Sequence, residues 1–315
     1  MADRSRGPRL ALIALALVIG GWWLLFGGPD RTADQDALRK SLGEARRPGP
    51  GAGTLQTVRA TGRVRIGYAN EAPYAYLDQE TGEVTGEAPV IAREVLSELG
   101  ATAIEPILTE FGSLIPGLQA GRFDLIAAGM YITPERCRQI RFSSPTYAIG
   151  EAFVVSEGNP KELHSYSDVA EHEDATLGVV AGTIERRYAR ATGVPDARVV
   201  VFPDAPSAVS GVAAGRVDAF AGTSLTVDDL LAKSRGSGLE RAEPFVDPVI
   251  DGSPTRGYGA FGFRKSDQAF ADAFDQELEE LIGSKRHLEL VAPFGFGSHS
   301  LPPSEVTTES LCSPS

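Results

Sequence analysis

Charged and aromatic side chains follow strand-like segments of this chain at several points. Val64, Ile66 and Tyr68 alternate as in a strand, and this segment runs into the polar and aromatic stretch NEAPY at residues 70–74. The same residue types return at Glu110-Phe111-Gly112 and in YITPER at residues 131–136. A carboxylate, aromatic rings and a guanidinium are groups that bind small ions and zwitterions. No His, Ser-His or Cys-His arrangement accompanies them, so the pattern favours binding over catalysis.

An internal repeat indicates which elements position these residues. Residues 117–130 (GLQAGRFDLIAAGM) are similar to residues 211–224 (GVAAGRVDAFAGTS), with Arg122 and Arg216 matching at an offset of 94 residues. Each copy predicts a helix that ends at a glycine and a short apolar strand after the Asp. Two copies favour two similar α/β lobes, since a solenoid needs several shorter repeats. Chance similarity of two Gly/Ala-rich segments is the alternative.

The remaining body fits alternating strands and helices. We predict strands at residues 153–155, 177–180 and 199–202, and helices at residues 89–99 and 270–281. These elements predict parallel sheets with helical crossovers, in which ligands bind outside the carboxyl ends of the strands. The cleft between two such lobes is therefore the expected site.

Composition narrows the range of functions. The 315 residues include 42 acidic and 30 basic side chains, a net charge of −12, which disfavours a nucleic acid partner. Residues 1–62 carry nine basic and five acidic groups, a net of +4, so the remaining 21 basic and 37 acidic groups give residues 63–315 a net of −16. Two Cys and four His do not fit an ordinary zinc site, and we predict neither a metal nor a cofactor.

The N-terminal segment predicts export. Residues 10–28 are uncharged and follow Arg4, Arg6 and Arg9, and a helix of this length spans roughly 28 Å, about the thickness of a bilayer core. We predict a cytoplasmic N-terminus at 1–9, a single-pass transmembrane signal-anchor at 10–28 and a linker at 29–62, with the body outside the cytoplasm. A cleaved secretory signal and a buried helix are the alternatives, and in the first case the body would be secreted.

Several motifs together resemble the solute-binding proteins of ABC importers for amino acids and their relatives. The resemblance covers residues 63–300 and includes VRIGYANEAPYAY, residues 117–130, TPERCRQIRFSSPTY and GAFGFRK. Within this family, NEAPY, PERC, the AGT of residues 181–183 and the late Leu311-Cys312 are similar to members that bind ectoine and hydroxyectoine. The resemblance implies a monomeric receptor that closes around a small zwitterionic solute and delivers it to an ABC permease.

The fold that the resemblance implies is α/β and bilobal. It is the periplasmic-binding-protein-like fold of type II, with two α/β lobes joined by a two-strand hinge. We expect the chain to cross between the lobes near residues 148–152 and again near 258–260. Lobe 1 would comprise residues 63–149 and 258–315, and lobe 2 would comprise residues 150–257.

The resemblance also implies which residues hold the two ends of the ligand. Arg136 would bind the carboxylate, because a planar guanidinium offers a pair of donors that match its two oxygens. Thr183 and the Gly182 amide would add donors from the second lobe. A surface salt bridge is the alternative for Arg136, and an ordinary helix N-cap is the alternative for Thr183.

The cationic end of the ligand would face a carboxylate and an aromatic cage. Glu71 supplies the charge, and Tyr74, Phe111 and Tyr131 supply the rings. Placement in the hydrophobic core is the alternative for these aromatics. Amino-acid receptors of the family usually carry an Asp after the second-lobe strand to bind a primary ammonium. Residues 220–224 hold no acid, which argues against a plain α-amino acid, and Thr223 would contribute only a hydroxyl contact.

Cys137 and Cys312 both fall in the predicted exported part. Oxidising conditions there favour a disulfide between the C-terminal tail and the first lobe, with two unrelated thiols as the alternative. Three other functions stay open. They are a cleft dehydratase on the same fold, a membrane-tethered sensor, and a receptor for another solute such as a cationic or other polar amino acid or a betaine.

Overall fold

The computed structural model describes residues 53–250 and 253–313. The predicted cytoplasmic N-terminus at 1–9, the predicted membrane helix at 10–28 and residues 29–52 of the predicted linker lie outside these ranges. Within the described residues, no helix combines the length and the apolar character that a membrane crossing needs.

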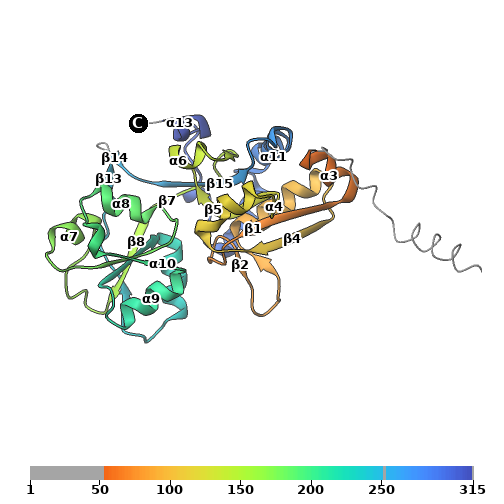
Figure 1. The fold of residues 1–315 in the computed structure, drawn as a ribbon. Coiled ribbons are helices and arrows are strands. Elements are labelled where there is room, and N and C mark those ends of the chain that lie inside the picture. Colours follow the sequence, from red (N-terminus) through yellow and green to blue (C-terminus); the bar gives the residue numbers. More distant parts are fainter. Residues whose placement is uncertain (1–52, 251–252, 314–315) are drawn as a thin grey trace, which may run out of the picture. The chain divides into compact units, whose positions relative to one another are not determined.

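In the first sheet β1 lies between β4 and β5. In the described part of the chain this sheet holds six strands in the order β4-β1-β5-β15-β6, with β7 paired to β15 (Figure 1). The strands are β1 (Arg63–Tyr68), β4 (Ala103–Leu108), β5 (Leu125–Tyr131), β6 (Arg141–Phe142), β7 (Tyr147–Ile149) and β15 (Gly257–Phe263). β1 is parallel to β4 and β5, whereas β15 is antiparallel to β5.

The second sheet repeats this arrangement around β9. Its order is β10-β9-β11-β8-β12, with β9 parallel to β10 and β11, and with β8 antiparallel to β11. The strands are β8 (Glu151–Ser156), β9 (Leu177–Val180), β10 (Val199–Phe202), β11 (Ala219–Thr223) and β12 (Leu239–Arg241). All of the strands predicted for this half of the chain therefore form one sheet.

The predicted parallel sheets are parallel only in part, because each sheet also contains an antiparallel strand that arrives from the other half of the chain. β8 begins beside the end of β11, where Glu151 pairs with Thr223, and β15 begins beside the end of β5, where Gly259 pairs with Tyr131. A strand that enters at the edge where its neighbours end must run in the opposite direction. The chain thus passes from the first sheet to the second between Ile149 and Glu151. The predicted hinge and lobe boundaries lie near these passages and stay predictions.

Helices cover the sheets and complete the core. The longer ones include α4 (Glu87–Glu98), α9 (Ala205–Ala213), α10 (Ser224–Lys233) and α11 (Gln268–Leu281), and α4 and α11 pack beside the first sheet (Figure 1). The predicted apolar face of α11 is buried at Phe270, Phe274, Leu278 and Leu281. The shorter helices are α3 (Thr54–Thr61), α5 (Leu114–Gln119), α6 (Pro134–Cys137), α7 (Tyr166–Glu171), α8 (Glu185–Ala191), α12 (Lys285–Val291) and α13 (Thr308–Cys312).

Small elements complete the connections. Two hairpins pair β2 (Tyr76–Leu77) with β3 (Val84–Thr85) and β13 (Val249–Ile250) with β14 (Ser253–Pro254). Four single 3₁₀ turns in the described residues are η1 (Phe111–Ser113), η2 (Asp196–Arg198), η3 (Ala292–Phe294) and η4 (Ser298–Ser300).

The repeated sequence forms the same structure in both sheets. After α5 the chain turns at Gly121 with φ +70°, and after α9 it turns at Gly215 with φ +67°. Both values lie in the left-handed region, where glycine adds no steric cost. Each turn leads into the middle strand of its sheet, β5 in the first sheet and β11 in the second.

The Asp of each repeat anchors its strand to the neighbouring parallel strand, β1 or β9. The Asp124 carboxylate accepts from the Arg65 backbone N–H at 2.9 Å and from the Arg65 guanidinium at 2.8 Å. The Asp218 carboxylate accepts from the Thr176 backbone N–H at 2.8 Å and from its hydroxyl at 2.7 Å. This shared role explains why the two sequence copies keep an Asp at the same place.

Residues 54–61 form helix α3, where the sequence analysis predicts linker. Val58 is buried, and the Thr54 hydroxyl donates to Asp267 at 2.8 Å and accepts from Arg264 at 3.0 Å. The sequence TLQTVRAT holds few apolar residues, so its helical period is weak and the helix depends on packing against α11. Helical structure in the described residues therefore begins before the predicted lobe boundary at residue 63.

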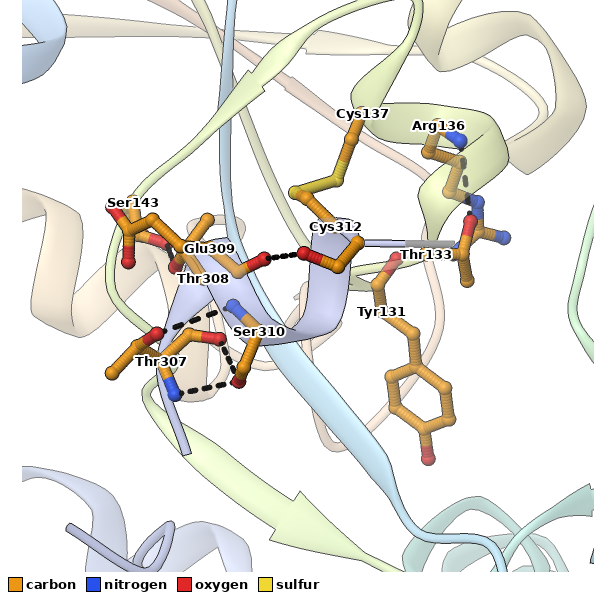
Figure 2. The surroundings of a disulfide bond; sticks show 11 residues. Tyr131, Thr133, Arg136, Cys137, Ser143, Thr307, Thr308, Glu309, Ser310 and Cys312 are labelled. Carbon is orange, nitrogen blue, oxygen red and sulfur yellow. Dashed lines mark hydrogen bonds between the residues drawn. A yellow bond between two sulfur atoms is a disulfide. The ribbon is translucent and has the colours of Figure 1, made fainter. Parts of the chain in front are cut away.

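A disulfide joins Cys137 of α6 to Cys312 of α13 (Figure 2). The Thr308 hydroxyl at the start of α13 also donates to the Ser143 carbonyl at 2.7 Å. Figure 2 shows α13 lying against the turn that contains Arg136, the residue before Cys137. The C-terminal helix is thus attached to the segment that carries a predicted ligand-binding residue.

We expect Asp124→Ala to lower the free energy of unfolding by about 2–3 kcal/mol, because it removes hydrogen bonds to a charged group and leaves buried donors unpaired. Urea unfolding measures this change. Asp272→Ala is the control, since Asp272 makes an exposed ion pair with Arg141 whose loss costs at most about 1 kcal/mol. Equal losses for the two variants would contradict the anchoring role of Asp124.

Candidate functional site

A small cavity lies between the two sheets, at the carboxyl ends of their parallel strands. Seven of the eight predicted ligand-binding residues line it. The lining residues are Glu71, Tyr74, Phe111, Ala128, Gly129, Tyr131, Arg136, Thr183, Ile184, Glu185 and Thr223. The eighth predicted residue, Gly182, lines a neighbouring groove together with Phe111 and Arg136. Loops from both halves of the chain therefore converge on one space.

Arg136 is held between the two halves of the chain. Its position begins with Thr133, whose hydroxyl caps α6 by accepting from the Arg136 backbone N–H at 3.2 Å. The guanidinium Nη1 donates to the Tyr131 carbonyl at 2.7 Å, and Nη2 donates to the Gly182 carbonyl at 2.9 Å. Its Cζ also lies 5.4 Å from the centre of the Phe111 ring.

The surface salt bridge considered for Arg136 is wrong. The residue is only 9% exposed, and no carboxylate of the described residues lies within 4.0 Å of its guanidinium. Burial lowers the pKa of Arg136, because removal from water disfavours the charged form. A buried guanidinium that meets only neutral carbonyls remains able to bind an anion.

The turn after β9 brings the second half of the chain against the first. Gly182 has φ +81°, and a Cβ added to it would lie 2.5 Å from the Cα of Gly112. Only a glycine permits this approach of two backbones. The contact that Gly182 makes to Arg136 is through its carbonyl, whereas the sequence analysis assigned a role to its amide. Thr183 donates its hydroxyl to the Val180 carbonyl at 2.9 Å.

Thr183 is not the N-cap of α8, so that alternative is wrong. The N-cap position belongs to Ile184, which makes no side-chain cap hydrogen bond. The side chain of Thr183 therefore closes the turn after β9, while the residue lines the cavity.

Glu71 reaches the second half of the chain through a hydrogen bond. Glu71 is partly buried, and the Thr226 hydroxyl donates to its Oε1 at 3.0 Å. The pKa of Glu71 is raised to about 7, because burial and the nearby Glu185 raise it more than the hydrogen bond from Thr226 lowers it.

The three predicted rings both line the cavity and join the core. Tyr74 and Tyr131 are 2% and 5% exposed and belong to the main hydrophobic cluster, while Phe111 is half-buried beside Arg136. The cage and the core interpretations therefore describe the same residues. The Tyr131 hydroxyl is buried and has no hydrogen-bond partner among the described residues.

Two rings behind this wall were missed from the sequence. Tyr147 and Phe296 lie 5.3 and 5.5 Å from Tyr74, measured between ring centres, and the Tyr147 hydroxyl donates to the Gly129 carbonyl at 2.7 Å. Tyr147 follows the motif FSSPT, and Phe296 lies near the C-terminus. No local signal connects either ring to the cavity, because only the fold brings them there.

Two buried carboxyl groups were also missed. Glu185 is 4% exposed and lines the cavity, and its Oε2 has no hydrogen-bond partner in the described part of the chain. Glu151 is also 4% exposed and accepts from the Tyr166 hydroxyl at 3.1 Å. Burial raises the pKa of both groups, and their mutual repulsion adds to it for Glu151. The position of Glu185, two residues after Thr183 at a helix start, is the sequence signal that could have found it.

These groups suit a ligand that carries both charges. The cavity offers one guanidinium, two carboxyl groups and three aromatic rings within one enclosed space. Among the described residues no cluster of His, Cys, Asp and Glu could hold a metal ion. The arrangement can bind an anion at Arg136 and a cation near Glu71 and Glu185.

Comparison with known proteins gives the family. Residues 64–297 match the model of the bacterial extracellular solute-binding proteins, family 3. The probable amino-acid ABC transporter periplasmic-binding protein of Sinorhizobium fredii is 42% identical over 266 residues, which cover 84% of this chain and 87% of that protein.

Two solved structures agree with this match. The crystal structure of EhuB in complex with hydroxyectoine is 36% identical with a TM-score of 0.75, and the match covers 83% of this chain and 98% of that one. An ancestral amino acid-binding protein, a precursor of cyclohexadienyl dehydratase, is 25% identical with a TM-score of 0.66 and covers 77% of this chain and 99% of its own length. The fold is therefore the bilobal α/β fold of type II that the sequence analysis expected, and this chain belongs to the bacterial extracellular solute-binding proteins of family 3.

Proposed function

We propose that this chain is the extracytoplasmic receptor of an ABC importer and that it binds ectoine, hydroxyectoine or a closely similar compatible solute. The ligand would enter the cavity between the two lobes, the lobes would close around it, and the closed receptor would deliver it to a membrane permease. Membership of a family of solute-binding proteins makes binding, and not catalysis, the activity of the chain.

One observation carries the ligand class. The cavity holds the Arg136 guanidinium and the Glu71 carboxyl group together with the rings of Tyr74, Phe111 and Tyr131. A small zwitterion with a delocalised cation would place its carboxylate on Arg136 and its cation against Glu71 and the rings. Similarity to EhuB, whose structure contains hydroxyectoine, supports the same class.

The eight predicted residues share this proposed role. They are Glu71, Tyr74, Phe111, Tyr131 and Arg136 from the first lobe, and Gly182, Thr183 and Thr223 from the second. Glu185 joins them as a second carboxyl group in the cavity wall.

A receptor for a polar or cationic amino acid is the alternative. Relatives such as the L-arginine-binding protein of Pseudomonas aeruginosa, 28% identical over 75% of this chain, favour it. At the end of β11, where such receptors usually carry an Asp, this chain has Thr223, whose hydroxyl is already bonded to Tyr74 at 2.8 Å. A neutral and occupied group is poorly suited to a primary ammonium, which favours the ectoine class.

Calorimetric titration of the full chain tests the ligand. We expect hydroxyectoine and ectoine to bind more tightly than arginine, glutamine or glycine betaine, because only the first two combine a carboxylate with a delocalised cyclic cation. Tighter binding of arginine or glutamine would overturn the ectoine assignment and leave the amino-acid alternative.

The predicted carboxylate contact has a matched test on the same short segment. We expect Arg136→Gln to weaken hydroxyectoine binding roughly 30-fold or more, since loss of one partner of a buried charge pair costs about 2–5 kcal/mol. Arg138→Gln is the control, because Arg138 is exposed two residues later. Titration of both variants, with melting temperatures to verify folding, separates the outcomes, and equal affinities would remove Arg136 from the site.

Export has a chemical signature in the two cysteines. If residues 10–28 anchor the chain or direct its secretion, the body matures in an oxidising compartment, where Cys137 and Cys312 stay paired. We expect a denatured, unreduced sample from the native host to take up no maleimide, and a reduced sample to take up two labels. Labelling of both thiols without reductant would contradict export.

A further inference from the structure

A continuous chain of hydrogen bonds crosses the junction between the two lobes twice. The Tyr74 hydroxyl donates to Thr223 Oγ1 at 2.8 Å, the Thr223 hydroxyl donates to Thr226 Oγ1 at 3.1 Å, and the Thr226 hydroxyl donates to Glu71 Oε1 at 3.0 Å. Tyr74 and Glu71 come from the loop after β1, whereas both threonines lie at the start of α10. The two ends of the chain are therefore in lobe 1 and its middle is in lobe 2.

The direction of every bond follows from the last acceptor. An ionised carboxylate has no proton to donate, so Thr226 must donate to Glu71. Its oxygen is then free to accept from Thr223, which in turn accepts from Tyr74 and from the Thr226 backbone N–H at 3.3 Å. Bonds aligned in this way polarise one another in a buried setting. The hydrogen bonds therefore all run in one direction, from Tyr74 to Glu71.

Thr226 is the residue in this series that is neither a cavity-lining group nor recognisable from the sequence. It is 1% exposed, so its hydroxyl cannot turn to water in the closed protein. It also lies in the first turn of α10, where the positive end of a ten-residue helix favours a nearby anion. The Thr226 hydroxyl and the N-terminus of α10 both stabilise negative charge on the Glu71 oxygen that faces lobe 2.

We propose that Thr226 is a positioning residue for ligand binding, which closes the cleft by bonding Glu71 from the opposite lobe and aims the carboxylate at the cationic end of the ligand. The ligand side of this inference rests on the proposed function. The closure side does not, because the bond joins two protein groups and forms only when the lobes meet.

A dependence on pH follows from the same contact. Burial raises the pKa of Glu71 to about 7, so below that pH the group is increasingly protonated and a cationic ligand must displace the proton. Affinity should therefore rise about tenfold per pH unit up to pH 7 and level off above it. Loss of the Thr226 donor removes a hydrogen bond that lowers the pKa of Glu71. The pH at which the affinity levels off, here called the pH break, should therefore move upward.

Other charged and titratable groups face Glu71 and must be separated from it. Glu185 at the start of α8 and Glu151 of β8 repel its charge, Tyr147 of β7 lies within reach of its field, and Arg136 lines the same cavity. These groups are unchanged in a Thr226 variant. A shift of the pH break in a Thr226 variant would therefore result from the lost contact with Glu71.

Thr226→Val tests the proposal, because valine keeps the volume and removes the hydroxyl. We expect hydroxyectoine affinity at pH 7 to fall roughly tenfold or more, the usual consequence of losing a buried hydrogen bond to a charged group. We also expect the pH break to move upward, and Thr226→Ser to restore both values. Calorimetric titration of the full chain between pH 5.5 and 8.5 measures these changes.

A second measurement needs no ligand. Hydrogen exchange followed by mass spectrometry should show faster exchange in residues 69–75 of ligand-free Thr226→Val, and normal exchange in Thr226→Ser. The matched control is Thr176→Val, since the Thr176 hydroxyl also donates to a carboxylate, that of Asp218, at 2.7 Å within lobe 2. This control should lose stability without changing exchange in 69–75 or the pH break.

The outcomes separate the two proposals. If Thr226→Val matches Thr176→Val in both the exchange of residues 69–75 and the pH break, Thr226 is only a packing residue and the inference is overturned. If wild type does not bind hydroxyectoine, the proposed ligand fails, and the ligand-free exchange alone decides for or against the closing contact.

Discussion

The burial of the Arg136 guanidinium between two lobes is the constraint on which the cleft depends. A guanidinium removed from water must direct its N–H groups at acceptors, and here one acceptor, the Tyr131 carbonyl, belongs to the first lobe and the other, the Gly182 carbonyl, belongs to the second. Contact between the lobes therefore supplies the hydrogen-bond acceptors that the buried guanidinium needs. The close approach of Gly182 to Gly112 follows from this need, since any side chain at Gly182 would hold the lobes apart.

The other charged groups of the cleft are carboxyl groups, whose charge is opposite to that of Arg136. Glu71, Glu151 and Glu185 are three carboxyl groups enclosed near a single guanidinium, and burial raises the pKa of each. Glu71 and Glu151 accept hydrogen bonds from hydroxyl groups, and one oxygen each of Glu151 and Glu185 has no partner among the described residues. A cationic group in the cavity would relieve this imbalance. A ligand shifts a protein toward a closed state by the difference between its affinities for the two states, and under the proposed function these carboxyl groups would be a source of that difference.

The scaffold positions these groups by the same structural arrangement in both lobes. In each lobe a glycine ends a helix and an Asp anchors the following strand, β5 or β11, to its parallel neighbour, β1 or β9. The carboxyl end of the anchored strand places residues in the cleft. β5 ends at Tyr131 and β11 ends at Thr223, so equivalent positions of the two repeats supply both walls. The disulfide at Cys137 adds a covalent tie one residue from Arg136, on the lobe where the position of the guanidinium matters.

The sequence alone determined the local parts of this protein. The alternation in residues 64–68, the glycine after each repeated helix and the apolar face from Phe270 to Leu281 arise from contacts within a few residues, so they predicted the strands and helices that the structure contains. Residue chemistry at strand ends was equally informative, because the carboxyl ends of parallel strands share one edge of a sheet. Seven of the eight predicted residues line the cavity for this reason.

Only the tertiary structure decided which groups partner one another. Tyr147 and Phe296 are 149 residues apart, and Thr226 lies 155 residues from Glu71, so no spacing in the sequence relates them. The antiparallel direction of β8 and β15 was missed because it depends on where the chain re-enters each sheet, and α3 was missed because its stability comes from α11. Burial of Glu151 also could not be read from an acidic chain, since the same residue type is exposed elsewhere. The pairing of charges depends on distance in space, and the lobes must fold and close before that distance exists.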